Sequence, residues 1–336
     1  MDYTITRTTR ASEIGKLLLI GIAVVLISLP YWAGRADMRF VAEVAYFIAL
    51  AQMWNLLAGY AGLVSVGQQA FVGLGGYLLF ALAVKLGIPP ISALFLAGLL
   101  TAVISIPTAF VVFRLRGAHF AIGTWVVAEV FRLSMAQVSE LGGGSGMSLP
   151  ASLVKSIAES RSGREMTIYY LALGISAVSI AVVYYLLRFK TGLALTAIRD
   201  SEEGADSLGV STFRTKFFVY VLVAGVTGLI GALIFLQKLR ISPDAAFSLP
   251  DWTVSAIFIV VIGGIGTLEG PILGAFVFFA LRAVLADYGS IYLIVMGVIA
   301  IAVMLRAPRG LWGLIHDKTG WQLFPVRRTL HLKDPL

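Results

Sequence analysis

Apolar residues occur along the chain in long runs, broken by short polar stretches. Ten runs approach the ~20 residues that a helix needs to cross ~30 Å of hydrocarbon. They predict membrane-crossing helices over residues 15–34, 40–57, 66–85, 91–113, 118–138, 168–189, 216–237, 252–268, 271–287 and 290–306. The eighth and ninth runs are short, so a half-helix or a re-entrant segment is the alternative there, and the expected number of crossings is eight to ten.

The composition supports this reading. Of 336 residues, 59% are hydrophobic and only 13% are charged, whereas a soluble domain carries ~25% charged residues. The chain is therefore expected to be an all-α polytopic membrane protein; a membrane β-barrel would show ~10-residue segments of strict alternation. Cysteine is absent, which excludes thiol chemistry. A cleavable signal peptide is the alternative for the first run, but its apolar stretch, Leu17 to Ala33, is long enough to favour an uncleaved helix.

The basic residues predict the orientation. With ten crossings, one side carries sixteen, namely Arg7, Arg10, Lys16, Arg114, Arg116, five from Arg188 to Lys216, and six from Arg306 onward; the other side carries eight. Loops rich in Lys and Arg stay in the cytoplasm, so both termini are expected there. The same rule explains the net charge of +8 without nucleic acid as a partner.

Two polar segments interrupt what is expected to be a single transmembrane domain over residues 1–336, with its core at 15–306. Residues 139–167 are expected to form an external loop, with a flexible glycine-rich turn before a short surface helix. Residues 190–215 form a cytoplasmic segment, and residues 307–336 a cytoplasmic tail. No phosphate-binding G-x-x-x-x-G-K-[ST] motif is present, and the three histidines lack metal-ligand spacing. The sequence therefore predicts no enzyme, no metal site and no cofactor.

Two glycine-rich tracts could interrupt helices at membrane depth. The first, from Asn55 to Phe71, carries Ser65 and Gln68, and a helix beginning near them would offer free N–H groups to an anion. The second, from Gly263 to Pro271, echoes it weakly about two hundred residues later. Interrupted helices at corresponding places in two halves point to a transport site; close packing through small residues is the alternative for each glycine.

A third feature is the cytoplasmic stretch from Ala197 to Gly209. Read as one helix, it places Ile198, Ala205 and Leu208 on one side and pairs Arg199 with Glu203. Such a helix would fit a groove in a partner protein; the alternative is a helix lying flat on the lipid surface.

Ionisable and amide side chains also fall inside the apolar runs. Glu129 and Arg132 are three residues apart on one predicted helix, which favours a structural ion pair over a proton relay. Glu43, Gln52, Gln137 and Arg282 need partners or water.

Several of these motifs together resemble the permease subunit of branched-chain amino-acid ABC importers, the longer of the two permeases that such systems carry. The resemblance spans residues 40–312 and rests on Gly59 to Phe71, Arg114 to Gly117, Ala197 to Gly209, Ile241 to Asp244, and Gly263 to Thr267 with Gly270–Pro271. In such permeases a cytoplasmic Glu-Ala-Ala pattern precedes a Gly by three residues. Here Glu203, Ala205 and Gly209 match, while Gly204 replaces the first Ala.

The resemblance implies a fold similar to type II ABC importers in the bacterial cytoplasmic (inner) membrane. It implies two ATP-binding subunits that bind the ATP, a second homologous permease and an extracytoplasmic substrate-binding protein. The coupling residues would be Ile198, Glu203, Ala205, Leu208 and Gly209, and the pathway for alternating access would be lined by Ser65, Gln68, Thr124, Gly263, Gly264 and Gly266. Alternatives are a urea or short-amide permease, an ATP-independent channel or secondary transporter, and a membrane enzyme.

Overall fold

The structure is a computed structural model that describes residues 3–6, 10–285, 291–321, 323–324 and 329–332. Its α-helices are α1 (Arg10–Ser28), α2 (Arg35–Asn55), α3 (Gln68–Phe80), α4 (Pro90–Val112), α5 (Ala118–Gln137), α6 (Ala151–Ile157), α7 (Arg161–Arg188), α8 (Lys190–Asp200), α9 (Glu202–Ser207), α10 (Thr212–Lys238), α11 (Pro243–Ala246), α12 (Ser255–Gly263), α13 (Gly270–Leu285), α14 (Ile291–Arg306) and α15 (Gly310–Thr319). Wider π-helical turns continue α2 over Leu56–Tyr60 and α3 over Ala81–Lys85, and one precedes α12 over Leu249–Val254. Single 3-10 turns lie at Leu29–Tyr31, Ser139–Leu141 and Gly143–Ser145.

Each of the ten predicted runs contains a helix, but ten crossings are not confirmed. In the described part of the chain, six helical segments are long and apolar enough to span a membrane: Arg35–Tyr60, Pro90–Val112, Arg161–Arg188, Thr212–Lys238, Pro243–Gly263 and Ile294–Thr319. Two shorter apolar segments are Leu17–Tyr31 and Gly270–Leu285. The α5 segment falls outside both groups and carries Glu129 and Arg132. The multi-pass architecture stands, while the exact number of crossings stays a prediction.

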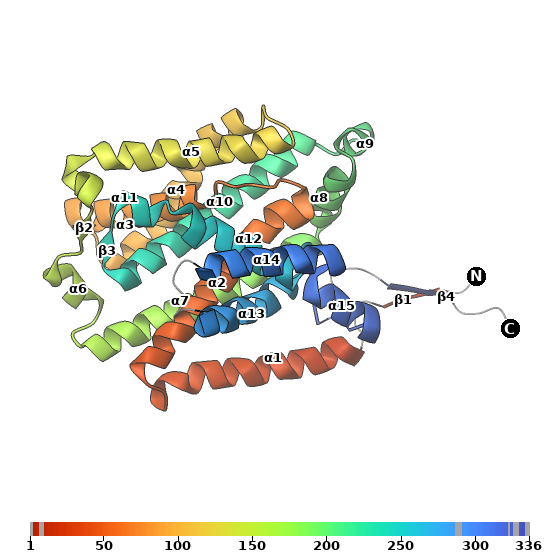
Figure 1. The fold of residues 1–336 in the computed structure, drawn as a ribbon, viewed down its shortest axis with the longest axis horizontal. Helices are drawn as coiled ribbons and strands as arrows, with labels where there is room; N and C mark the ends of the chain where they lie inside the picture. Colours follow the sequence, from red (N-terminus) through yellow and green to blue (C-terminus); the bar gives the residue numbers. More distant parts are fainter. Residues whose placement is uncertain (1–2, 7–9, 286–290, 322, 325–328, 333–336) are drawn as a thin grey trace.

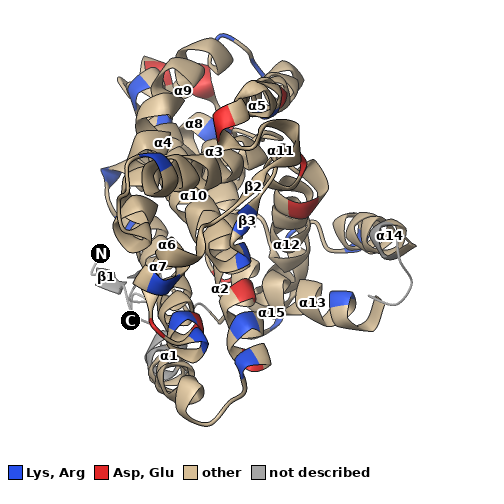
Figure 2. Ribbon diagram, turned by 90° about the vertical axis from the view of Figure 1, so that its left-hand side faces the viewer, with Lys and Arg blue, Asp and Glu red and all other residues tan. Residues whose placement is uncertain are grey.

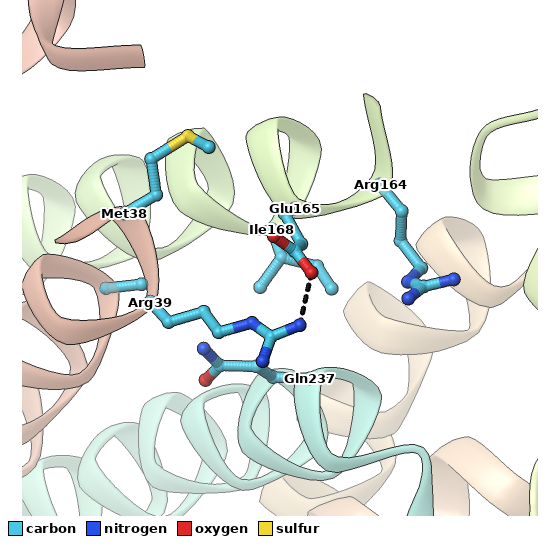
Figure 3. A pocket seen from close by; sticks show the side chains of 7 residues that line it. Met38, Arg39, Arg164, Glu165, Ile168 and Gln237 are labelled. Carbon is cyan, nitrogen blue, oxygen red and sulfur yellow. Dashed lines mark hydrogen bonds and ion pairs between the residues drawn. The ribbon is translucent and has the colours of Figure 1, made fainter. Parts of the chain in front are cut away.

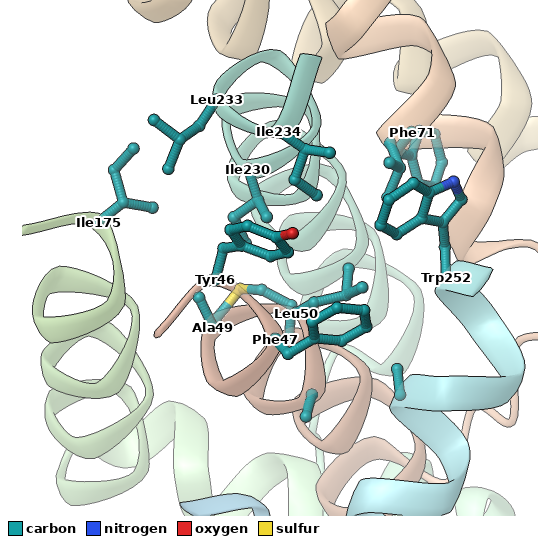
Figure 4. Close-up of a cluster of buried hydrophobic side chains, with 14 of the residues drawn as sticks. Tyr46, Phe47, Ala49, Leu50, Phe71, Ile175, Ile230, Leu233, Ile234 and Trp252 are labelled. Atoms are coloured by element: carbon teal, nitrogen blue, oxygen red, sulfur yellow. The ribbon is translucent and has the colours of Figure 1, made fainter. Parts of the chain in front are cut away.

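Helix α10 is the centre of the bundle and packs against α2, α3, α4 and α7 (Figure 1). It approaches α3 closely because glycines remove side chains from the contact: a Cβ atom on Gly75 would lie 1.8 Å from the carbonyl oxygen of Gly228. Large apolar side chains fill the space between α2, α7, α10 and the π-turn before α12 (Figure 4), including Tyr46, Leu50 and Trp252. Small residues therefore set the helix spacing and large ones fill the core.

Short strands and helices distinguish the two ends of the bundle. At one end lie α6 and a two-stranded sheet in which β2 (Met147–Ser148) pairs antiparallel with β3 (Arg240–Ile241). At the other end lie α8, α9 and the antiparallel pair of β1 (Tyr3–Thr6) with β4 (Thr329–Leu332). Long stretches of the intervening helices carry no charge, whereas acidic residues gather on α9 (Figure 2). This arrangement agrees with a bundle whose two ends meet water.

Candidate functional site

The first glycine-rich tract is a break between two helices. After the π-turn Leu56–Tyr60, residues 62–67 are non-helical, and α3 begins at Gln68. Gly62 has φ +69°, a left-handed conformation that glycine adopts without strain. Leu63 and Ser65 are buried while Val64 is exposed, so irregular backbone lies against protein on one face.

Side chains from three helices hold this break in place. Trp54 Nε1 donates to the Ser65 carbonyl at 2.8 Å, and the Val66 amide donates to Thr124 Oγ1 at 3.1 Å. Gln68 Nε2 donates to Thr227 Oγ1 at 2.6 Å, while its Oε1 has no partner among the described atoms. The predicted pathway residues Ser65, Gln68 and Thr124 are thus brought together, but all three are buried in this conformation.

The second tract joins α12 to α13. Gly263 ends α12 and packs so closely on α13 that a Cβ atom would lie 1.8 Å from the Gly270 carbonyl oxygen. Gly264 has φ +136° and Gly266 has φ +74°, so the chain reverses between two helices. Close packing, the alternative from sequence, accounts for Gly263, while the positive φ values account for Gly264 and Gly266.

Two amide side chains at the end of α2 connect the tracts. Asn55 Nδ2 donates to the Thr267 carbonyl and Asn55 Oδ1 accepts from the Gly266 amide, both at 2.8 Å. One helical turn earlier, Gln52 Nε2 donates to the Leu268 carbonyl at 2.6 Å, while Gln52 Oε1 has no hydrogen-bond partner among the described atoms. The end of the first tract's helix therefore holds the backbone of the second tract directly.

The segment expected to be cytoplasmic contains two helices, α8 and α9, here called the α8–α9 segment, which corrects the single helix expected from Ala197 to Gly209. Ser201 is extended (φ −159°, ψ 110°), and its hydroxyl caps α9 by accepting from the Gly204 amide at 3.1 Å. The apolar ridge is consequently divided: Ile198 and Ala205 are 4% and 2% exposed and pack inward, whereas Leu208 is 84% exposed. The Ser201 hydroxyl bonds to a backbone amide at the start of α9, and this local hydrogen bond favours the start of a new helix over continuation of α8.

Gly209 ends the second helix. It has φ +81°, and the next amide, of Val210, returns to the Ala205 carbonyl at 3.0 Å. This is a helix C-terminus of the kind that glycine favours, so the match to the family's glycine has a conformational reason.

Arg199, at the end of α8, connects the α8–α9 segment to the first tract. Its Nη1 donates to the Gly59 carbonyl at 3.1 Å, inside the π-turn, and its guanidinium pairs with Asp200 at 2.9 Å. The predicted pair with Glu203 is wrong, because the break at Ser201 carries Glu203 away from Arg199. Gly62 lies against the Arg199 side chain. The α8–α9 segment, the first tract and, through Asn55, the second tract therefore form one contact chain, here called the junction.

A cleft of about 380 Å³ opens beside α9. Its lining is mostly acidic or hydroxylic, namely Arg116, Ser201, Glu202, Glu203, Asp206 and Thr212. Lys216 pairs with Glu202 and leaves Glu203 and Asp206 available to a partner's basic groups. The cleft and the exposed Leu208 give this end of the bundle both a charged and an apolar contact surface.

The predicted intrahelical pair is present and has a third member. Arg132 contacts Glu129 at 2.6 Å and Asp244 of α11 at 2.7 Å. The Glu129 side chain is 45% exposed, although it lies midway along α5. Charged side chains of this exposure are stable beside protein or water rather than lipid, so this face of α5 suits a protein or aqueous contact.

Sequence reasoning missed several residues of the junction. The sequence pattern pairs Arg199 with Glu203 and gives Thr227 and Thr253 no role, although Thr227 bonds to Gln68 and Thr253 exchanges hydrogen bonds with Gln69. Polar residues within apolar runs were the available signal. A second ion pair between Arg282 and Glu43, at 2.8 Å, supplies partners that the sequence required.

Comparison with known proteins identifies the family. The family described as "Branched-chain amino acid transport system / permease component" matches residues 38–305. The chain belongs to this family. No solved structure matches the chain.

Curated relatives agree. The chain is 28% identical to the high-affinity branched-chain amino acid transport system permease protein LivM of Salmonella typhimurium, over 88% of this chain and 74% of the relative. It is 27% identical to the protein of that name from Escherichia coli K12, with the same coverage. A probable branched-chain amino acid transport permease protein LivH of Methanocaldococcus jannaschii is 27% identical over 39% of this chain and 44% of the relative. The resemblance inferred from the motifs is thereby confirmed: the chain is a branched-chain amino-acid ABC permease, a multi-pass membrane protein of transport.

Proposed function

We propose that the chain is the permease subunit of an importer that moves branched-chain amino acids, or other hydrophobic amino acids, across the bacterial inner membrane by alternating access. Partner subunits bind and hydrolyse ATP, so the chain itself is no enzyme and needs no cofactor. One observation carries the proposal most directly: Arg199 links the segment exposed at one end of the bundle to the Gly59 carbonyl within a broken helix. Movement of α8 and α9 therefore reaches both glycine-rich tracts.

The contacts of α8 and α9 support docking of two ATP-binding subunits, one on each permease of a pair. Ile198 and Ala205 anchor the two helices inward, while Glu203, Leu208 and the acidic cleft face outward. A partner that pushes on α9 moves a segment already fixed to the bundle by buried side chains. Gly209 lets the chain turn back toward α10.

The α5 face supports a second, homologous permease as neighbour. Glu129, Arg132 and Asp244 lie there, half-exposed or exposed, and need protein or water around them. Ser65, Gln68 and Thr124 are buried behind the same region, so we propose that they line the pathway in a state in which α3 and α5 separate. We propose that Gly263, Gly264 and Gly266, between α12 and α13, line the pathway opposite these residues and act as its hinge.

Docking of an extracytoplasmic binding protein is supported by the sheet that joins the predicted external loop to the segment after α10. Strand β2 belongs to residues 139–167 and pairs with β3 of residues 238–251, and the Leu149 amide donates to the Leu239 carbonyl at 2.9 Å. The two segments thus form one surface, at the end of the bundle opposite α8 and α9 (Figure 1). The larger number of basic residues on the side of the termini, together with this surface at the opposite end, supports cytoplasmic termini and a binding protein that docks from outside the cell membrane.

The test is Arg199→Gln in proteoliposomes that contain the complete transporter with its binding protein. We expect ATP hydrolysis to continue while leucine uptake per ATP falls about tenfold, because a charge-assisted bond to the Gly59 carbonyl contributes ~1.5 kcal/mol or more. Arg214→Gln, an exposed arginine on the same side, is the matched control and should leave coupling unchanged. Equal coupling in both variants would remove the junction from the mechanism, and uptake without ATPase subunits would overturn the proposed function.

A further inference from the structure

A second polar site lies far from the junction, in a hollow between α2, α7 and α10 (Figure 3). It is lined by Met38, Arg39, Ala42, Arg164, Glu165, Ile168 and Gln237. The hollow has a cavity volume of only about 20 Å³. Its inner part therefore fits one small group, such as a water molecule or an ammonium.

Glu165 supplies the unusual feature of this hollow. Its side chain is 5% exposed, and Oε1 accepts from Arg39 and lies 3.4 Å from Arg161 Nε. Oε2 is buried and has no hydrogen-bond partner among the described residues. A buried carboxylate oxygen without a donor is costly, so the site calls for an N–H or O–H group from a ligand.

The surrounding charge says what else that ligand carries. Arg39 and Arg161 contact Glu165, and Arg164 lines the same hollow (Figure 3), so three arginines and one carboxylate leave two positive charges in excess. A bare cation would be repelled, and a bare anion would leave Oε2 unpaired. A group that joins a primary ammonium to an anionic oxygen satisfies both. Two kinds of molecule have that chemistry: an amino acid, and the phosphoethanolamine-type headgroup of an aminophospholipid.

The position favours the lipid. Arg39 and Asn55 lie on the same helix, sixteen residues apart, which places the hollow about 24 Å from the junction. Nearby, Tyr31 and Trp32 are 78% and 66% exposed, as aromatic residues are at the headgroup level of a bilayer. Helix α1 runs along the edge of the bundle (Figure 1) with most of its large apolar side chains exposed, and it meets α7 where Tyr169 donates to the Leu26 carbonyl.

We propose that this hollow binds the headgroup of an aminophospholipid, with the ammonium on Glu165 Oε2 and the phosphate on Arg164. The lipid's tails lie against the exposed face of α1. The bound headgroup would donate a hydrogen bond to Glu165 Oε2, and its phosphate would offset part of the positive charge of the arginines. Both contacts would stabilise the packing of α2, α7 and α10. The site requires only that the bundle sits in a bilayer, so it stands or falls separately from the transport function.

The test is lipid binding to the purified full-length chain, measured by native mass spectrometry with three lipids of identical acyl chains. Phosphatidylethanolamine has N–H donors on a charged ammonium, phosphatidylcholine has a quaternary nitrogen without them, and phosphatidylglycerol has an anionic phosphate and neutral hydroxyl donors but no ammonium. We expect phosphatidylethanolamine to bind about tenfold more tightly than phosphatidylcholine, the effect of one charge-assisted hydrogen bond. Glu165→Leu should bring that ratio near one, and Arg164→Gln should weaken both lipids alike.

Arg35→Gln, which changes an exposed arginine outside the hollow, is the matched control and should bind as the unaltered chain does. If Glu165→Leu does not fold, Glu165→Gln replaces it, and the ratio should still fall to about threefold or less as the charge is lost. Equal binding of phosphatidylethanolamine and phosphatidylcholine by the unaltered chain would overturn the proposal and leave water as the occupant. Displacement of bound lipid by leucine would overturn it in favour of an amino-acid site. Preference for phosphatidylglycerol over phosphatidylethanolamine would also overturn it, because phosphatidylglycerol lacks the ammonium.

Discussion

Asn55 offers the sharpest test of the link between the two glycine-rich tracts. Its amide makes two hydrogen bonds of 2.8 Å, to the Gly266 amide and the Thr267 carbonyl. Asn55 itself is fully buried, whereas Gly266 and Thr267 are half-buried. Asn55→Leu keeps a side chain of similar volume but removes both bonds, so it isolates the polar contact from the packing.

The structure sets the size of the effect. Each bond lost at a buried group costs ~1–3 kcal/mol, and the half-buried backbone partners place the total near the low end, at about 2 kcal/mol. Protection of the Gly266 amide against hydrogen exchange should therefore fall about 30-fold. Because the loop is then free of α2, leucine uptake per ATP should fall as well.

Hydrogen–deuterium exchange of the peptide containing residues 264–268 measures the first effect, and proteoliposome uptake measures the second. Gln137→Leu makes the same change from amide to apolar side chain at an exposed position on α5, and it should leave that peptide unchanged. Unaltered exchange in Asn55→Leu would refute the inference that α2 holds the second tract. Faster exchange with normal uptake would keep the contact but remove it from the mechanism.

Three further predictions concern packing, charge and pH. Gly75→Ala should prevent folding, because its Cβ atom would lie 1.8 Å from the Gly228 carbonyl oxygen. Gly174→Ala, whose Cβ atom would have no neighbour within 4 Å, should stabilise the chain by up to ~1 kcal/mol. The yield from size-exclusion chromatography and thermal unfolding distinguish the two variants, and a folded Gly75→Ala chain would contradict the tight α3–α10 contact. Glu203→Lys should leave membrane insertion intact but uncouple ATP hydrolysis from uptake, and normal vesicle uptake would remove Glu203 from coupling. Burial raises the pKa of Glu269, despite hydrogen bonds from the Leu323 and Phe324 amides that lower it. The folded state therefore holds the Glu269 proton more tightly than the unfolded state, so the free energy of unfolding should fall as pH rises from about 4.5 through the raised pKa. Glu269→Gln should flatten that part of the pH–stability curve. The same curve in the variant and the unaltered chain would contradict this role of Glu269.

The sequence alone determined the features that depend on local composition. Runs of apolar residues located the ten helical segments, because a chain in hydrocarbon must satisfy its backbone hydrogen bonds internally. Spacing along one helix predicted the contact of Glu129 with Arg132, since residues three apart share a face. The family motifs were likewise visible in the order of residues, and the comparisons confirm the family.

Tertiary structure decided what depends on partners distant in the chain. The expected helix over Ala197–Gly209 breaks at Ser201 because a side-chain cap and burial of Ile198 and Ala205 outweigh helical continuity. Arg199 then finds the Gly59 carbonyl 140 residues away, and Asn55 finds Gly266 at a separation of 211. Spacing rules reach only one or two turns along a helix, so they could mark these polar residues as needing partners but could not choose the partners. That choice follows from which helices pack together, and at α3 and α10 it rests on glycines that let two backbones meet.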